Sequence, residues 1–190
     1  MRLENWFEVP APPKQAWELL IDVPRVVPCM PGATLDEAVD DTTWKATVAV
    51  KLGAISLSFK ADVKLEEADE LMGRARLATK AREARGRGNA SATIESSLTP
   101  AGGGTRVDIV TDLQLAGAVA QYGRGLVQDV SSQLITQFAD CLKAQLTASP
   151  EEAAAAVEAQ ARPVQGLRLG LGALWRALAR LFRRRPRKPG

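Results

Sequence analysis

Few residues of this chain have the types and spacing that enzyme catalysis or metal binding needs. Histidine, the commonest general base and metal ligand, is absent from all 190 residues. The two cysteines, Cys29 and Cys141, form no CxxC or metal-spaced set, so we expect two reduced, partly buried thiols. The acidic residues fall mostly on the polar sides of strands or in turns, without a closely spaced inward pair. The sequence therefore predicts no catalytic residues, no metal site and no enzyme activity.

Positive charge is concentrated at the C-terminal end of the chain. The formal net charge is +3, but Glu158 is the last acidic residue and nine basic residues follow it. The first 158 residues hold 16 basic and 22 acidic side chains, which gives them a net charge of about −6. A nucleic-acid-binding body would carry its own basic face. We therefore expect no nucleic-acid partner.

Residues 164–190 predict a basic amphipathic helix. At 100° per residue, the large apolar side chains other than Leu169 fall within an arc of about 120°, and most arginines fall on the opposite face. This pattern is typical of a helix that lies in the interface of a membrane with anionic lipids, and arginines interrupt the apolar run too early for a membrane span. A docking helix for a protein partner is the main alternative. The residues expected to bind the membrane are Leu171, Leu174, Trp175, Arg176, Leu178, Arg180, Leu181, Phe182, Arg183, Arg184 and Arg185.

Hydrophobic residues alternate with polar ones through much of the body, which predicts half-buried antiparallel strands. Turn residues such as "RGRGN" and "PAGGGT" separate them, so neighbours in sequence are expected to pair as a meander. The expected strands are residues 3–9, 34–39, 44–52, 57–66, 71–83, 90–98 and 107–115. The sequence thus predicts a seven-stranded antiparallel sheet.

The helices are predicted in two places. Two short helices, at residues 14–20 and 23–27, lie between prolines after the first strand. At residues 123–146 apolar residues recur at steps of three and four, as one long helix requires. Its apolar stripe needs a partner, and the inner face of the sheet is the one large apolar surface available. We therefore expect an α+β fold in which a curved sheet wraps around a long C-terminal helix.

Small residues occupy much of the inner face in the middle strands. They are Gly73, Ala75, Ala81, Ala90 and Ala92. Two explanations are open. Small side chains allow a helix to pack closely against a sheet, and they can also leave an apolar cavity, which is the usual form of a small-molecule site.

Three stretches of the body resemble a known family. "CMPGATL" at residues 29–35, "KLGAISLSFKADVKL" at 51–65 and "YGRGLVQDVSSQLITQFADCL" at 122–142 are similar to the CoxG subunit of carbon monoxide dehydrogenase, within the START-like (SRPBCC) helix-grip superfamily. The resemblance covers residues 1–147. It implies a helix-grip fold and a non-enzymatic accessory protein that recruits a carbon monoxide dehydrogenase-type molybdenum hydroxylase to the cytoplasmic membrane.

The same resemblance implies an apolar ligand between sheet and helix, because helix-grip proteins hold lipids, sterols and polyketides there. It suggests no covalent cofactor, but a bound menaquinone, ubiquinone or lipid. An adaptor with a filled core and no ligand is the alternative. Carried onto this chain, the expected ligand-binding residues are Pro31, Gly32, Phe59, Tyr122, Arg124, Leu126, Val130 and Phe138.

Three segments follow from these patterns. Residues 1–147 are expected to form the START-like domain, and 164–190 the membrane-binding tail. Between them, residues 148–163 begin with a serine, proline and glutamate capping pattern and continue as an alanine-rich run, which predicts a helical spacer. The N-terminus lacks the apolar run of a signal peptide. We therefore expect a cytoplasmic protein, peripheral on the inner face of the cell membrane.

Overall fold

A computed structural model describes residues 1–52 and 55–147 of the chain. The elements are β1 (Arg2–Val9), α1 (Pro13–Ile21), α2 (Val23–Val26), η1 (Val27–Cys29), β2 (Ala33–Ala38), β3 (Thr43–Leu52), β4 (Ile55–Asp69), β5 (Arg74–Glu83), β6 (Gly88–Ala101), β7 (Gly104–Gly117), η2 (Ala118–Gln121) and α3 (Arg124–Thr147). The expected spacer and membrane-binding tail, residues 148–190, lie outside the described residues.

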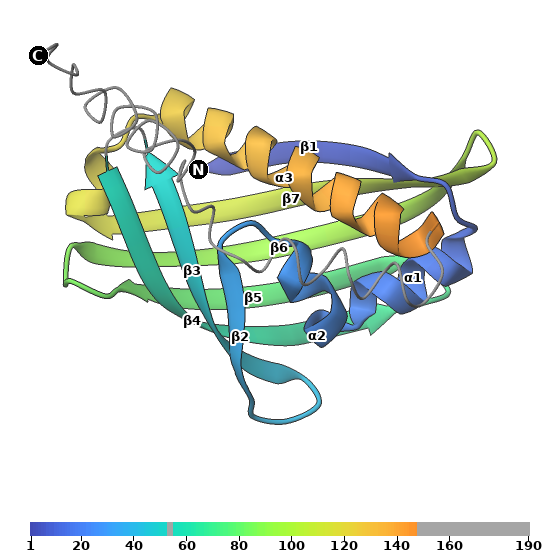
Figure 1. Cartoon of the computed structure of the whole chain (residues 1–190), viewed down its shortest axis with the longest axis horizontal. Coiled ribbons are helices and arrows are strands. Elements are labelled where there is room, and N and C mark those ends of the chain that lie inside the picture. Colours follow the sequence, from blue (N-terminus) through green and yellow to red (C-terminus); the bar gives the residue numbers. More distant parts are fainter. Residues whose placement is uncertain (53–54, 148–190) are drawn as a thin grey trace, which may run out of the picture.

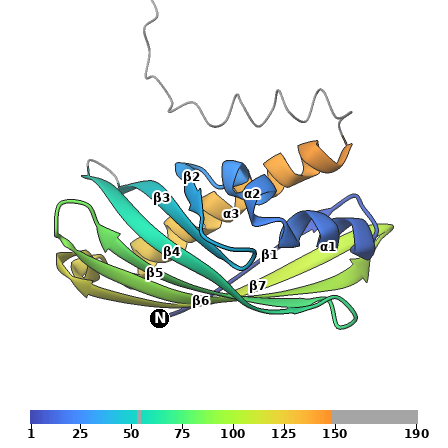
Figure 2. The ribbon, with the colours of Figure 1, turned by 90° about the horizontal axis from the view of Figure 1, so that it is seen from below.

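All seven strands belong to one antiparallel sheet in the order β1-β7-β6-β5-β4-β3-β2 (Figure 1). The strands from β2 to β7 form a meander, and β1 joins its far edge beside β7. The helices lie on one side of this curved sheet, and α3 runs across it next to β1 (Figure 2). The predicted α+β helix-grip fold, with two short helices after the first strand and a long C-terminal helix, is confirmed.

One predicted strand begins too early. The prediction placed residues 71–83 in a single strand, whereas β5 starts at Arg74 and residues 70–73 form the turn after β4. Gly73 has a φ of +60°, which favours glycine over residues with a side chain. Leu71 is 98% exposed and therefore does not continue the buried face of β5. Gly73 is thus a turn residue rather than part of β5, and a Cβ atom there would lie 2.9 Å from the Leu98 carbonyl oxygen.

The core is built where α3, α1 and the sheet meet. Phe138 of α3 packs edge-to-face on Phe7 of β1, with ring centroids 6.0 Å apart. Trp17 and Leu19, on the inner side of α1, belong to the same buried cluster. The fully buried residues of α3 all lie between Phe138 and Leu142, in its second half. This half of the helix is the part that is anchored most firmly.

A disulfide bond joins Cys29 at the end of η1 to Cys141 of α3. The expectation of two reduced thiols is therefore wrong. The two residues are 112 positions apart, so their spacing in the sequence does not indicate the pairing, but α3 packs against η1 and brings their Cα atoms to 5.4 Å. Gln145, one turn after Cys141, donates hydrogen bonds from Nε2 to the Cys29 sulfur and the Arg25 carbonyl. The second half of α3 is thus fixed to the segment that follows α2.

Candidate ligand-binding cavity

An apolar cavity of about 510 Å³ lies between the inner face of the sheet and the helices. This volume falls within the range of small-molecule sites, about 300–1,000 Å³. Its walls come from all seven strands, from α1, α2 and η1, and from α3 as far as Phe138. Aliphatic and aromatic side chains dominate the lining.

The cavity exists because α3 is packed unevenly along its length. In its second half, Phe138 and Leu142 are buried. In its first half the inward residues Val127, Val130 and Leu134 are only partly buried and line the cavity instead. Small side chains on the sheet leave the space open. Of the small inner-face residues noted in the sequence, Ala75 and Ala90 line the cavity, and they are joined by Ala46 and Ala61.

A few polar groups interrupt this apolar lining. They are Thr79, Ser96, Thr111, Tyr122 and Ser131. Ser131 accepts a hydrogen bond from Asn5 Nδ2 at 3.1 Å. The hydroxyl groups of Thr79, Thr111 and Tyr122 have no hydrogen-bond partner within residues 1–52 and 55–147. A ligand with an apolar body and a small polar group therefore finds both kinds of contact here.

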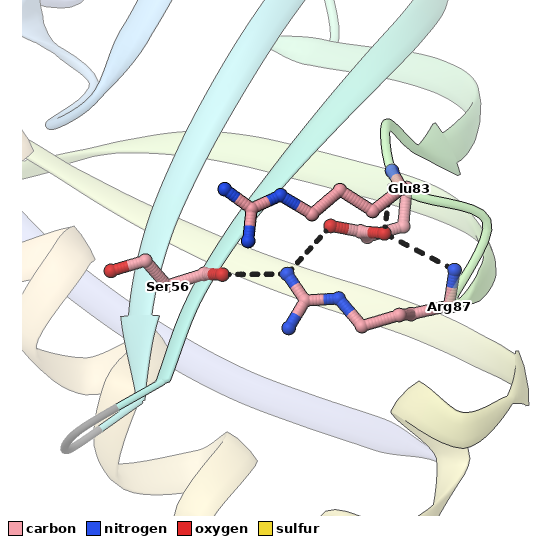
Figure 3. Close-up of polar contacts among 4 residues, drawn as sticks. Ser56, Glu83 and Arg87 are labelled. Carbon is pink, nitrogen blue, oxygen red and sulfur yellow. Dashed lines mark hydrogen bonds and ion pairs between the residues drawn. The ribbon is translucent and has the colours of Figure 1, made fainter.

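A charged cluster outside the cavity wall lies in and beside the turn between β5 and β6 (Figure 3). Glu83 Oε2 accepts hydrogen bonds from the backbone N–H groups of Arg85 and Arg87, at 2.8 and 3.1 Å. The Arg87 guanidinium donates to Glu83 Oε1 at 2.9 Å and to the Ser56 carbonyl at 2.7 Å. The cluster thereby ties the β5–β6 turn to the beginning of β4.

The electrostatics of this cluster follow from its hydrogen bonds. The side-chain bond from Arg87 is the main cause that lowers the pKa of Glu83 to about 2, and the two backbone donors add to it. The Glu83 carboxylate in turn raises the pKa of Arg87. Arg87 Nε is buried and has no partner in the described part of the chain. Sequence reasoning missed this cluster, because "EARGR" indicates only a turn.

The structure brings together half of the ligand-binding residues expected from the sequence. Phe59, Tyr122, Val130 and Phe138 line the cavity. The remaining four, Pro31, Gly32, Arg124 and Leu126, are not part of its wall.

Gly32, Arg124 and Leu126 have other positions. Gly32 has a φ of +78°, and a Cβ atom there would lie 2.2 Å from the Ala49 carbonyl oxygen, so a turn against β3 requires glycine. Arg124 is the exposed first residue of α3, and Leu126 is 40% exposed.

A curved antiparallel sheet closed by a long C-terminal helix around an apolar cavity defines a protein of the helix-grip, SRPBCC-like class. Residues 6–147 match the family of the carbon monoxide dehydrogenase subunit CoxG, and the chain belongs to that family. The family is one of accessory subunits. No curated protein matches the chain.

Solved structures share the fold at low sequence identity. A conserved protein from Geobacillus kaustophilus is 20% identical, with a TM-score of 0.64 over 73% of this chain and 90% of that one. Protein Ms6760 from Mycobacterium smegmatis is 19% identical, with a TM-score of 0.53 over 77% and 90% of the two chains. TTHA0849 from Thermus thermophilus is 17% identical, with a TM-score of 0.52 over 74% and 95%. At these identities the similarity concerns the fold alone.

Within the described residues, no helix combines the length and the hydrophobicity needed to cross a bilayer.

Proposed function

We propose that this protein is a non-enzymatic accessory protein that recruits a carbon monoxide dehydrogenase-type molybdenum hydroxylase to the cytoplasmic membrane and binds a quinone or lipid between sheet and helix. Membership of the CoxG family supports the association with the dehydrogenase. The apolar cavity supports the ligand, and the basic amphipathic segment at residues 164–190 supports the membrane contact.

The single observation that supports a bound ligand is the cavity of about 510 Å³. Water in this space would meet a lining that offers few hydrogen bonds. An apolar molecule that displaces this water gains the hydrophobic contribution of every buried CH₂ group, about 0.8 kcal/mol each. Thr79, Thr111 and Tyr122 offer hydroxyl groups to its polar end. A menaquinone, a ubiquinone or a lipid has this combination of parts.

The membrane contact is argued from the sequence of residues 164–190. If six large apolar side chains contribute about 1 kcal/mol each on entering the interface, and several arginines contribute about 1 kcal/mol each at an anionic leaflet, both contributions favour the membrane-bound state. Hydrophobic and ionic contributions are both needed. The result is a peripheral protein on the inner face of the membrane.

Flotation with liposomes tests the membrane contact. The full chain should float with vesicles that contain phosphatidylglycerol, and a chain that ends at residue 163 should not. Binding to neutral vesicles at high salt should be weaker, because the arginines then contribute little. Equal flotation of the two chains would remove the tail from the proposal.

The alternative is an adaptor with no ligand. It requires the space between sheet and helix to be occupied by the protein's own side chains, which the cavity argues against. Mass spectrometry of small molecules extracted from the purified protein separates the two proposals. A carrier should bring a quinone or lipid with it, and an adaptor without a ligand should bring none.

We also propose that the protein has no catalytic activity of its own. The chain contains no histidine. The carboxylate with the most strongly lowered pKa, that of Glu83, is engaged by donors from Arg85 and Arg87 and lies outside the cavity lining. A group held in this way stabilises a turn and is poorly placed to transfer protons to a ligand.

A further inference from the structure

The face of the sheet that points away from the cavity contains a hollow of about 1160 Å³ with a charged lining. Side chains along a strand alternate between faces. Phe59, Ala61 and Thr79 line the inner cavity, so Lys60 and Lys80 point outward. Arg82, two residues after Lys80, is exposed on the same outer face, and all three cationic side chains line the hollow.

Two of these cations face each other directly. Lys60 on β4 is in register with Arg82 on β5, and Arg82 is in register with Asn89 on β6. Opposed Cβ atoms in an antiparallel pair lie about 4.5–5.5 Å apart, and like charges in that position reduce stability. Within residues 1–52 and 55–147, neither Lys60 nor Arg82 forms an ion pair or a side-chain hydrogen bond. Lys60 and Arg82 therefore present positive charge without an ion-pair partner, with a neutral amide beside them on β6. On β3 the row continues to Thr47, whose hydroxyl donates to Asp36 Oδ2 at 2.7 Å, so one carboxylate also lies at this edge of the hollow.

The neighbouring row alternates in sign. Asp62 on β4 is in register with Lys45 on β3 and with Lys80 on β5. Lys45 is already paired with Glu37, with 2.7 Å between Nζ and Oε2. Ser91 continues the row on β6. The hollow thus combines one row that attracts anions with a second row that contains both signs.

We infer that this outer hollow, lined by Lys60, Arg82, Asn89, Asp62 and Lys80, is the docking surface for a carboxylate-bearing segment of a protein partner. A protein can place carboxylates against Lys60 and Arg82 and a cation near Asp62. A nucleic-acid backbone offers negative charge alone, which Asp62 repels, and a flat bilayer does not enter a hollow. The inference rests on the proposed function for the identity of the partner, a carbon monoxide dehydrogenase-type enzyme.

Charge reversal tests this surface in the full chain. The Lys60→Glu/Arg82→Glu variant keeps a like-charge pair across the strands, so its folding stability should stay close to that of the unaltered protein. The control Lys14→Glu/Lys64→Glu makes the same change in net charge at exposed positions outside the hollow. The affinity for the purified carbon monoxide dehydrogenase of the source organism should fall at least about tenfold in the first variant and less than about twofold in the control. The difference in affinity between the two variants should shrink at high salt.

A third variant separates binding from folding. Arg82→Glu alone turns the repulsive pair with Lys60 into an attractive one, so the melting temperature should rise while enzyme binding falls. A variant that lost binding through misfolding would melt at a lower temperature instead. If the hollow is a docking surface, the melting temperature should therefore rise while the affinity for the enzyme falls.

The remaining outcomes are equally specific. Equal weakening in both double variants, or no weakening in either, overturns the inference and leaves the proposed function standing. Loss of binding to phosphatidylglycerol vesicles in Lys60→Glu/Arg82→Glu, with enzyme binding intact, overturns it in favour of a membrane-facing surface. Failure of the unaltered chain to bind the enzyme overturns the proposed function and the inference together.

Discussion

Removal of the bond between Cys29 and Cys141 should cost this fold a large part of its stability. The bond closes a loop of 112 residues. In the chain-entropy description, a loop of that length restricts the unfolded chain by about 4.8 kcal/mol at 25 °C, and native disulfides typically contribute about 2–5 kcal/mol. For a domain of about 150 residues, about 1 kcal/mol corresponds to about 2–4 °C in melting temperature, so the expected fall is about 4–20 °C.

Thermal unfolding followed by circular dichroism measures this effect. The unaltered protein, purified without reductant, is compared with the same protein refolded in reductant and with a Cys29→Ala/Cys141→Ala variant. Reductant should lower the melting temperature of the unaltered protein and leave that of the variant unchanged. Two freely alkylated thiols in the folded protein purified without reductant, or a melting temperature that reductant does not change, would refute the reasoning.

Three further substitutions or conditions give distinct outcomes. Ala75→Trp places a large ring in the cavity, so it should abolish co-purification of an apolar ligand. It should also destabilise the fold by less than overpacking of a filled core does, for which the cost is about 1–3 kcal/mol. Ala78→Trp on the outer face is the matched control and should retain the ligand, whereas a free energy of unfolding in urea that is several kcal/mol lower for Ala75→Trp would show a filled core. Because the pKa of Glu83 is lowered from 4.5 to about 2, the contribution of its carboxylate to stability is present above about pH 4.5 and is lost as the pH falls towards 2. Glu83→Gln should therefore flatten the dependence of melting temperature on pH between about 5 and 2. An unchanged slope would contradict this. Gly32→Ala should destabilise the fold by about 1–3 kcal/mol in urea unfolding, because φ is +78° there and the new Cβ would meet the Ala49 carbonyl of β3. An unchanged free energy of unfolding would show that the turn adapts.

Much of the fold could be predicted from the sequence because the period of the hydrophobic pattern changes with the type of element. Alternation located the strands, and the change to steps of three and four located α3 within one residue at each end. The pattern failed at residues 71–73, where Leu71 and Met72 continue an apparent alternation but lie in a turn. Composition alone does not distinguish an apolar residue in a strand from an exposed one at its tip.

The candidate site was harder to predict from the sequence than the fold. Small residues on the inner face left both close packing and a cavity open, because the distance of α3 from the sheet depends on where its large residues anchor it. Phe138 and the disulfide at Cys141 hold the second half of the helix, and the cavity opens under the first half. The cluster of Glu83 and Arg87 depends on a turn that folds back on β4, a contact with Ser56 that spans 31 residues. Long-range contacts of this kind leave no periodic signal in the sequence.

The proposed function depends on an apolar molecule in the space between sheet and helix. Mass spectrometry of small molecules extracted from the full chain, purified without denaturant, shows whether one is bound. We expect a quinone or lipid in near-equimolar amount, and its loss in the Ala75→Trp variant. An extract free of such molecules, from a protein that also fails to bind added menaquinone, ubiquinone and phospholipid, would contradict it.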